Sequence, residues 1–434
     1  MSLTWYPTPL PTANSRTDDV WFHDDLLGWA VNSDGKLFRT RDGAQTWEEL
    51  QLFPDSYLRC VTFSSPMRGW IGTLSGPHRL YATEDGGETW QPVRGLPDNS
   101  PARICGLIAV TDDVVFAAGT NYPDETAGVL RSTDGGNTWT LLDLGLTPAL
   151  LVDIFFQDER TGWVVGGVDE VLHPDRDTVR RDVVPVVLAT EDGGATWRNA
   201  IEVNTGIGEF PRGEWGWKIQ KLGESTLLVS LENLHDGAIL RSNDLGQTWE
   251  RLAINDRQRN ANLEGIGFLD DSVGWVGGWG DLFFQGGYTS ETLDGGKTWN
   301  NANHVGFRLN RFRFIGDPVR VAYASGDTVY KLAEAPIRRD MVHVPPTELA
   351  ADNVVTFDID VPEGTERLEV RIWERFGREV RHLLSETAPA TGTRKITWDF
   401  ADERGETSDP GSFIVRIVTD DTSVSQIVHH RSRK

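Results

Sequence analysis

The sequence predicts an all-β protein in which a seven-bladed β-propeller, closed by its N-terminal strand, precedes a small β-sandwich. Three observations lead to this prediction: a motif that returns six times, short alternating segments between the copies, and a change of pattern after residue 334. We expect the propeller over residues 1–334, a Pro- and charge-rich linker over 335–346, and the sandwich over 347–434.

The repeated motif has the form Ser/Thr-x-Asp-x-Gly-x-Thr-Trp, as in STDGGNTW at 132–139. The other copies lie at 40–47, 83–90, 190–197, 242–249 and 292–299. Successive motif tryptophans are 43, 49, 58, 52 and 50 residues apart, at Trp47, Trp90, Trp139, Trp197, Trp249 and Trp299. A period of about fifty residues is typical of a propeller blade.

Each repeat contains four short strand-like segments, rich in Val, Ile, Phe and Trp and bounded by turn residues. The fourth repeat shows them as LLVDIFFQD, TGWVVGGV, DVVPVVLAT and the segment after Trp197. A Gly-Trp pair opens the second segment at Gly28–Trp29, Gly69–Trp70, Gly162–Trp163 and Gly274–Trp275. The motif therefore lies on the turn between the third and fourth strands.

The last repeat is incomplete, because about three strands of chain follow Trp299 and no motif comes after them. The N-terminal LTWYPTPL is similar to the segments that follow the motif elsewhere, and Trp5 lies 42 residues before Trp47. We expect residues 3–10 to supply the missing outer strand, which removes the open sheet edges and gives seven blades.

The motif allows a structural or a metal-binding interpretation. Its carboxylate can accept backbone N–H bonds within a tight turn, its Gly can adopt a left-handed backbone, and its Trp can bury a large apolar area. The acidic members are Asp42, Asp85, Asp134, Asp192, Asp244 and Asp294. A calcium loop needs several oxygen ligands and a terminal Glu, which the copies lack. We therefore interpret the motif as structural and expect neither a metal nor a cofactor.

These copies resemble the Asp-box, or BNR, repeat of sialidases, sortilin-type receptors and photosystem II assembly-factor-like propellers. The resemblance implies that the boxes are structural and lie away from the functional face. The first copy departs from the pattern with Ala44, so we expect a distorted turn there. The fifth has Leu245 after its Asp, at a position that the pattern leaves free.

The opposite face should carry any binding site, because its loops vary most in length. Aligning the innermost strands places one residue of each blade at an equivalent position near the channel mouth: Asp18, Arg59, Arg103, Val152, Lys218, Glu264 and Asn310, with Arg311 as a near equivalent. Cationic members could clamp a carboxylate or sulfate. Alternatively, the ring consists of self-compensating ion pairs that fill the channel, and we slightly favour this interpretation.

Aromatic residues and histidines also fall in the expected loops of this face. Trp217, Trp279, Phe283, Phe284 and Tyr288 could stack on a sugar or on a partner's apolar side chain, or could pack against a neighbouring blade. The histidines are His78, His173, His235 and His304, whose spacing does not support a metal site.

An enzymatic function is the competing hypothesis, because sialidases share the repeat. Arg59, Arg103 and Arg311 could mimic the sialidase arginine triad. However, the Phe/Tyr-Arg-Ile-Pro motif of that family is missing, sialidases have six blades, and no Tyr/Glu pair stands out. The rhythm of 155–167 and 190–197 looks most like the assembly-factor-like group, whose members bind proteins. We therefore lean towards a non-catalytic protein, with a glycoside hydrolase as the alternative.

Composition restricts the partners. The chain has 42 Lys and Arg against 65 Asp and Glu, a formal net charge of −23, which disfavours nucleic-acid binding. No apolar run approaches the length of a membrane span, and the first fifteen residues lack the features of a signal peptide. Cys60 and Cys105 are interpreted as small buried hydrophobic residues, with a bridge or a reactive thiol less expected.

The C-terminal segments alternate with a two-residue period and resemble the Ig-like domain of the flagellar hook-capping protein and the sorting tails of type IX-secreted bacterial proteins. The matching residues are Val370, Ile372, Gly377, Arg378, Val380, Trp398, Asp399, Asp402, Gly405, Gly411 and Phe413, while Phe400 replaces a usual Gly. This resemblance implies an Ig-like sandwich and either export with surface attachment or a spacer role.

Taken together, these observations predict a monomeric recognition or scaffold protein that binds a protein or glycan at the channel-mouth face. We expect it at the cell surface or outside the cell, with the periplasm as an alternative.

Overall fold

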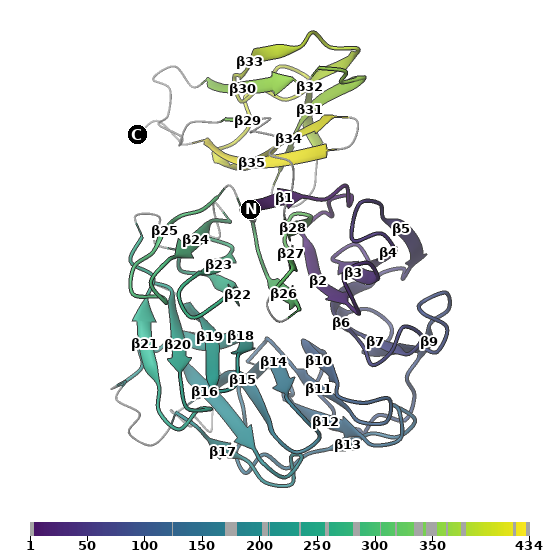
Figure 1. The fold of residues 1–434 in the computed structure, drawn as a ribbon, viewed down its shortest axis with the longest axis vertical. Coiled ribbons are helices and arrows are strands. Elements are labelled where there is room, and N and C mark those ends of the chain that lie inside the picture. The colour runs from purple at the N-terminus through teal and green to yellow at the C-terminus, as the bar shows by residue number, and fades with distance from the viewer. Residues whose placement is uncertain are drawn as a thin grey trace.

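We analysed a computed structural model, which describes residues 4–123, 125–169, 180–201, 207, 209–233, 236–256, 260–280, 287–303, 305–316, 319–333, 342–343, 354–361, 363–374, 379–419 and 422–430. Within these ranges the chain is almost entirely β, with one 3-10 turn, η1 (Arg180–Asp182). Figure 1 shows sheets arranged in a ring and two further sheets beyond its edge. The predicted all-β class is confirmed.

The described residues between Thr4 and Ala333 form seven four-stranded antiparallel sheets. The first four are, in pairing order, β2 (Thr17–Phe22), β3 (Gly28–Asn32), β4 (Lys36–Thr40) and β5 (Glu48–Leu52); β6 (Tyr57–Phe63), β7 (Gly69–Ser75), β8 (Leu80–Thr83) and β9 (Gln91–Pro92); β10 (Gly106–Ala109), β11 (Val115–Gly119), β12 (Gly128–Ser132) and β13 (Thr140–Leu141); and β14 (Leu150–Phe156), β15 (Gly162–Asp169), β16 (Val183–Thr190) and β17 (Arg198–Asn199).

The other three follow the same plan. They are β18 (Glu214–Leu222), β19 (Thr226–Asn233), β20 (Ala238–Ser242) and β21 (Glu250–Ala253); β22 (Leu263–Phe268), β23 (Gly274–Gly278), β24 (Thr289–Thr292) and β25 (Asn300–Asn301); and β26 (Arg311–Ile315), β27 (Val321–Ser325), β28 (Val329–Ala333) and β1 (Thr4–Pro7).

The first strand of each sheet contacts the first strand of the next: β2 with β6, then β10, β14, β18, β22 and β26, which contacts β2 again. These innermost strands therefore surround the axis of the ring. Neighbouring sheets pack through apolar clusters between them. For example, Trp29 of β3 stacks on Phe63 of β6 with ring centroids 3.7 Å apart.

The N-terminal strand β1 is the outer strand of the last sheet, as the sequence predicts. It pairs with β28 in the register Thr4↔Ala333 to Pro7↔Tyr330. Trp5 is buried there, and its ring lies edge-on to Trp275 at 5.3 Å. The two ends of the ring-forming segment are thus held in one sheet.

The antiparallel pairing assigns the connections to two faces. The turns between first and second strands share one face with the motif turns, at 40–47, 83–90, 132–139, 190–197, 242–249 and 292–299. Backbone hydrogen bonds join the two kinds of turn, as from Gly86 N to Met67 O at 2.8 Å. The second-to-third-strand turns and the crossovers between sheets lie on the other face, which we call the channel-mouth face.

The remaining strands form two sheets that share one apolar core, built around Phe357, Val370, Trp398 and Val415. One contains β29 (Val342–His343), β30 (Val355–Val361) and β33 (Gly392–Trp398). The other contains β32 (Glu379–Thr387), β31 (Arg367–Glu374), β34 (Gly411–Thr419) and β35 (Thr422–His430). The Ig-like assignment and the domain boundaries stay predictions, and most of the predicted linker lies outside the described residues.

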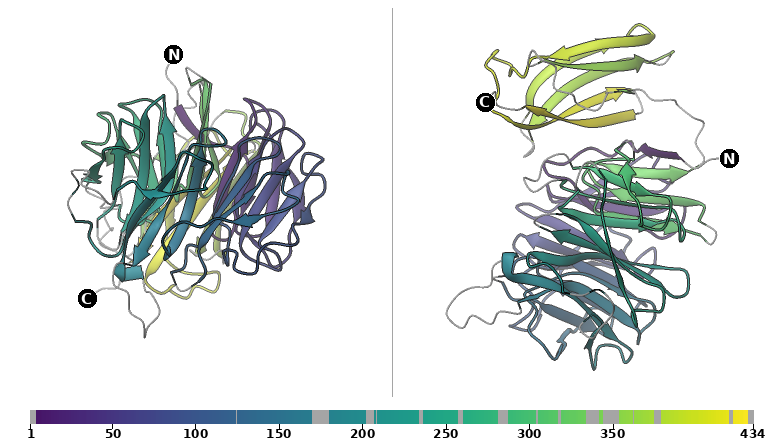
Figure 2. Two further views of the ribbon diagram at one scale, coloured as in Figure 1. Left: turned by 90° about the horizontal axis from the view of Figure 1, so that it is seen from below. Right: turned by 90° about the vertical axis from the view of Figure 1, so that its left-hand side faces the viewer.

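Figure 2 shows these two sheets stacked beyond the edge of the ring that carries β1. Arg416 of β34 donates to the Thr12 hydroxyl, in the connection after β1. Burial lowers the pKa of the Arg416 guanidinium, and the nearby Asp327 carboxylate opposes that shift. A half-buried charged residue of the C-terminal sheets thus contacts the ring.

Candidate functional site

The six motif turns share one hydrogen-bond pattern. In the second copy, Asp85 accepts from Thr89 N at 2.9 Å, from Thr89 Oγ1 at 2.6 Å and from Thr83 Oγ1 at 2.8 Å. The same three bonds recur at Asp42, Asp134, Asp192, Asp244 and Asp294. Each carboxylate is therefore occupied within its own turn.

The motif tryptophans complete these turns. The indoles of Trp90, Trp139, Trp197, Trp249 and Trp299 each donate to the carbonyl of the second motif glycine, at 3.0–3.2 Å. Trp47 instead donates to Thr8 Oγ1 at 3.1 Å, so the first copy is joined to the segment after β1.

Two expectations about the motif are wrong. Ala44 adopts a φ of 67°, and Asp42 keeps all its bonds, so the first turn is not distorted. The position after the Asp is not free of constraint, because Leu245 has a φ of 56° where the other copies carry a left-handed glycine. This backbone conformation costs non-glycine residues about 1–2 kcal/mol.

β-bulges on the innermost strands explain which side chains point into the channel. Register shifts occur between Thr17 and Asp19, Leu58 and Cys60, Leu151 and Asp153, Gly216 and Ile219, and Leu263 and Gly265. Asp18, Arg59, Val152 and Glu264 are the extra residues of four of these bulges, and the bulge of the fifth sheet contains Trp217 and Lys218. Five of the seven aligned positions thus lie at bulges. A bulge re-aims the side chains at its site.

The alignment fails at Arg103. In the third sheet Gly106 pairs with Ala118, and Cys105 N also donates to Ala118 O. Two residues of β10's side thus oppose Ala118, so Cys105 occupies the bulge position, two residues after Arg103. Arg103 instead lies in the crossover before β10, where it forms a bidentate pair with Glu125 at 2.6 and 2.7 Å. The predicted ring position is therefore corrected from Arg103 to Cys105.

An ion pair crosses the channel. Arg311 of β26 binds both oxygens of Asp153 of β14, at 2.6 and 2.8 Å, and its Nε lies 3.2 Å from Asp19 of β2. Burial raises the pKa of Asp153, but the charges of Arg311 and Lys218 outweigh burial and hold it below its usual value. Side chains of three sheets thus meet on the axis, and the sheet of Asp153 is not a neighbour of the other two.

A second group of charges lies beside this pair. Arg16 contacts Glu264 and, at 3.2 Å, Asp18, and all three side chains are buried. Trp279 donates to Glu264 Oε1 at 2.9 Å, while the Arg16 guanidinium lies 4.7 Å from its ring. Trp279 is thus held by the charges of the channel.

Arg59 and Lys218 reach the same space from β6 and β18. Arg59 Nη1 contacts Asp18, and its guanidinium lies 5.3 Å from the ring of Trp217, the neighbour of Lys218. Trp217 is buried and donates to Asn310 Oδ1 at 3.3 Å. Arg59, Arg103 and Arg311 are thus engaged by three different carboxylates, Asp18, Glu125 and Asp153, rather than by one point.

An arginine–aromatic group lies on the channel-mouth face. Tyr122, which is 40% exposed, has the Arg103 guanidinium 4.4 Å from its ring centroid and that of Arg180 at 5.5 Å. Arg180 also lies 5.2 Å from the ring of Trp215. Sequence reasoning named only Arg103 of this group. A tyrosine in the 120–127 turn, beside a predicted arginine, was the available signal.

Two buried carboxyl groups lie below this face. Trp215 donates to Glu232 Oε2 at 3.2 Å, and Arg180 lies 3.9 Å from Oε1. Burial raises the pKa of Glu232 to about 8, with Arg180 opposing and Glu264 adding to the shift. Glu232 and Glu264 are 1% and 2% exposed, so the pair is not in an open cleft.

The remaining predicted residues are dispersed. Tyr288 is half-buried, and its carbonyl accepts from Asn260 Nδ2 at 2.9 Å. His78 is exposed and lies 5.6 Å from Tyr81. Five further candidates lie outside the described residues, namely His173, His235, His304, Phe283 and Phe284.

Cys60 and Cys105 are buried free thiols, and burial raises the pKa of both, that of Cys105 to about 11. Among the described residues, no group of three or more His, Cys, Asp or Glu side chains could hold a metal ion. The same part of the chain contains no helix with the length and hydropathy of a membrane span.

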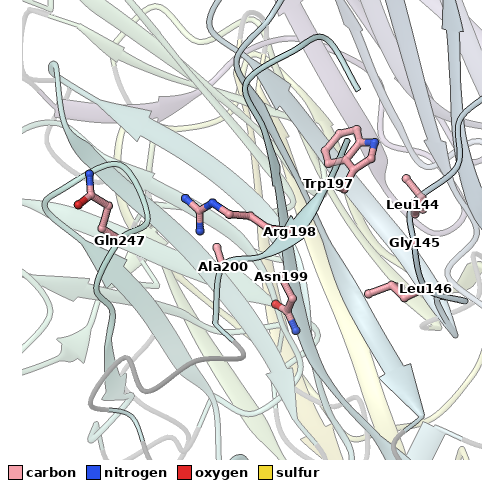
Figure 3. Close-up of a pocket in the computed structure, with 8 residues that line it drawn as sticks. All are labelled: Leu144, Gly145, Leu146, Trp197, Arg198, Asn199, Ala200 and Gln247. Atoms are coloured by element: carbon pink, nitrogen blue, oxygen red, sulfur yellow. The ribbon is translucent and has the colours of Figure 1, made fainter. Parts of the chain in front are cut away.

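A surface cavity of about 460 Å³ lies away from the channel. Its lining residues are Leu144, Gly145, Leu146, Trp197, Arg198, Asn199, Ala200 and Gln247. In Figure 3, Arg198 and Gln247 lie on one side, and Trp197 and the Leu144–Leu146 segment on the other. None of the predicted channel-mouth residues lines it.

The comparisons with known proteins agree with this geometry. Residues 1–140 match the family model of the photosynthesis system II assembly factor YCF48. A structure of YCF48 bound to a D1 peptide is similar, with a TM-score of 0.52 and 19% identity over 77% of this chain and 98% of that one. The chain contains a BNR-type β-propeller.

Two further structures share the fold of the BNR propeller. YCF48 from Cyanidioschyzon merolae has a TM-score of 0.51 and 18% identity over 76% of this chain and 98% of that chain. The GH74 xyloglucanase from Xanthomonas campestris has a TM-score of 0.53 and 11% identity over 98% of this chain and 75% of that one. The sequence has no significant match among curated proteins.

Proposed function

We propose that this BNR propeller is a non-catalytic scaffold that binds a segment of a partner protein on its channel-mouth face. The observation that carries the proposal is the exposed Tyr122 between Arg103 and Arg180. Tyrosine and arginine are enriched among the residues that dominate binding energy at protein interfaces. The likeness to YCF48 bound to a D1 peptide supports peptide binding as the class of function.

The positions of the flanking arginines favour this use of Tyr122. Arg103 is anchored by Glu125, and Arg180 Nη2 donates to Asn121 O at 2.7 Å. The ring is therefore held between two ordered guanidinium groups while 40% of it is open to a partner. An anchored aromatic residue loses little conformational entropy on binding, which favours affinity.

The test is a selection of random peptides displayed on phage against the purified full-length chain. Selected peptides should bind the wild type and lose at least tenfold in affinity for Tyr122→Ala. Met67→Ala is the matched control, because Met67 is 54% exposed on the opposite face. Enrichment of no peptide, or binding that depends on Met67 rather than Tyr122, would contradict the proposal.

A glycoside hydrolase is the second candidate, favoured by the Glu232 and Glu264 pair. A carboxylic acid that keeps its proton near neutral pH beside a second carboxyl group is suited to glycosidic hydrolysis. The burial of both groups disfavours this second candidate. A glycan array and a panel of chromogenic glycosides, with xyloglucan included, decide the question. If the wild type turns over a glycoside and Glu232→Gln does not, the protein is a hydrolase and the scaffold proposal is wrong.

We also propose that the C-terminal sheets form an Ig-like unit of an exported or surface-attached protein. Support comes from the resemblance of that region to sorting tails and from the core shared by its two sheets. Fractionation of cells that produce the full-length protein tests this, and recovery exclusively from the cytoplasm would contradict it.

A further inference from the structure

One edge of the Arg59 guanidinium has no partner, although the side chain is buried. Nη1 contacts Asp18, whereas Nε and Nη2 make no hydrogen bond to any described residue. Those two groups form the side-on fork that binds a carboxylate through two parallel hydrogen bonds. Buried donors without an acceptor cost about 1–3 kcal/mol each. The two unpaired donors of Arg59 therefore need an explanation.

Lys218 is a second buried donor, close enough to Arg59 for their charges to interact. Its side chain is 2% exposed, and within the described part of the chain its ammonium makes no hydrogen bond or ion pair. Burial lowers the pKa of Lys218 to about 8, and the positive charges of Arg311 and Arg59 act in the same direction. The carboxylates of Asp153 and Asp19 oppose this shift without contacting the ammonium.

The charges around Arg59 and Lys218 do not balance. Among the described residues, five cations meet four carboxylates, so the group carries one excess positive charge: Arg16, Arg59, Lys218, Arg311 and Arg313 against Asp18, Asp19, Asp153 and Glu264. Each of the four arginines is within 4 Å of a carboxylate oxygen, and Lys218 is not. A single monovalent anion would neutralise the excess.

We propose that the channel holds a carboxylate between the Nε/Nη2 fork of Arg59 and the ammonium of Lys218. The planar fork selects a planar two-oxygen acceptor, and the excess of one charge favours a monovalent anion over sulfate or phosphate. The carboxylate belongs either to a small free anion or to the end or an acidic side chain of a bound peptide. Only the peptide source rests on the proposed scaffold function.

The first test measures the Lys218 side chain directly. The pKa of its amine is followed by NMR of protein labelled at the lysine ε-position, in chloride buffer and in acetate at equal ionic strength. Acetate bound beside the ammonium stabilises the protonated form, so the pKa of Lys218 should rise in acetate. Lys221 on the same strand, whose Nζ donates to Gly223 O at 2.8 Å, should not respond. Equal responses of the two lysines, or none, would show that the space holds water only.

Two variants separate the fork from simple charge. Arg59→Lys keeps the charge but loses the two parallel donors, and Lys218→Met removes the excess charge. Acetate binding should raise the melting temperature of the wild type. Both variants should need at least ten times more acetate for the same rise, and Lys221→Met should respond like the wild type. If Lys218→Met does not fold, Arg59→Lys and the NMR titration still decide. A response of Arg59→Lys equal to that of the wild type would show that the carboxylate does not bind to the Nε and Nη2 donors of Arg59.

The source of the carboxylate is tested with trialanine and its C-terminal amide. Competition of trialanine with acetate, and none by the amide, would assign a chain terminus as the ligand. Acetate binding without trialanine binding would assign a free small carboxylate and exclude the terminus. Stronger binding of sulfate or phosphate than of acetate would overturn the proposal. These outcomes do not involve Tyr122, so they are independent of the scaffold test.

Discussion

The indole Nε1 of Trp29 donates a hydrogen bond of 3.1 Å to the carbonyl of Gly86 in the motif turn of the next sheet. Gly86 O also accepts from Arg39 Nη1 at 3.3 Å. The motif turn is therefore fixed to the preceding sheet as well as within its own. This arrangement makes the motif a connection between sheets, in addition to the turn that the sequence predicts.

The Trp29 bond can be measured with a matched pair of variants. Trp29 and Trp70 are both fully buried, but Trp70 Nε1 has no hydrogen-bond partner among the described residues. Trp29→Phe should lower the free energy of unfolding by about 0.5–1.5 kcal/mol more than Trp70→Phe, the net value of one hydrogen bond. Chemical denaturation gives both values. Equal losses would show that the cross-sheet bond adds nothing.

Backbone strain at the second motif glycine gives opposite expectations in two copies. Gly87 has a φ of +92°, and a Cβ there would lie 3.3 Å from both Leu50 and Trp29. Gly87→Ala should therefore cost about 1–2 kcal/mol. Ala44→Gly relieves the same strain but loses a buried methyl group worth about 0.8 kcal/mol, so it should stabilise the fold slightly, by about 0.2–1.2 kcal/mol. Thermal unfolding of both variants tests this, and a large loss in Ala44→Gly would contradict it.

The motif carboxylates predict loss of stability in acid. Hydrogen bonds from the Thr196 and Thr298 side chains and backbones lower the pKa of Asp192 and of Asp294 from 3.8 to about 2. The stabilisation is present above the unfolded pKa near 3.8 and is lost as pH falls towards 2. Urea midpoints measured between pH 5 and 2 should fall, and less steeply in Asp192→Asn. An identical slope in that variant would assign the acid sensitivity to other groups.

Glu232 predicts a dependence of opposite sign. Its pKa is raised from 4.5 to about 8, so its protonated form is favoured in the folded state. This contribution is complete below pH 4.5 and is lost as pH rises through about 8. Glu232→Gln should remove that loss between pH 5 and 9 in urea titrations. If stability depends on pH in this variant as it does in the wild type, a group other than Glu232 takes up the proton.

The fold could be predicted because its signals are local and repeated. The motif turns, the Gly-Trp pairs and the alternation each occur within about ten residues, and the pairing of β1 with β28 follows from counting the strands. The bulge positions at Asp18, Lys218 and Glu264 were predicted for the same reason. In the third sheet, β10 begins later, so the position moves from Arg103 to Cys105.

The partners within the channel could not be predicted. Arg311 binds Asp153 from a sheet that is not its neighbour, and nothing in the spacing of the two residues relates them. Arg16 precedes its strand and was outside the aligned positions, although it contacts Glu264. Such contacts depend on the diameter of the ring and on side-chain length, which a linear pattern does not contain.

The pairing of β1 with β28 also has a consequence for biosynthesis. Trp5 leaves the ribosome before Ala333, the last residue of the strand it pairs with, so β1 stays unpaired while the intervening sheets are made. During that interval its edge and its indole are available to chaperones or to a wrong partner. Completion of the ring is therefore a late, long-range event, which makes slow maturation an intrinsic property of this architecture.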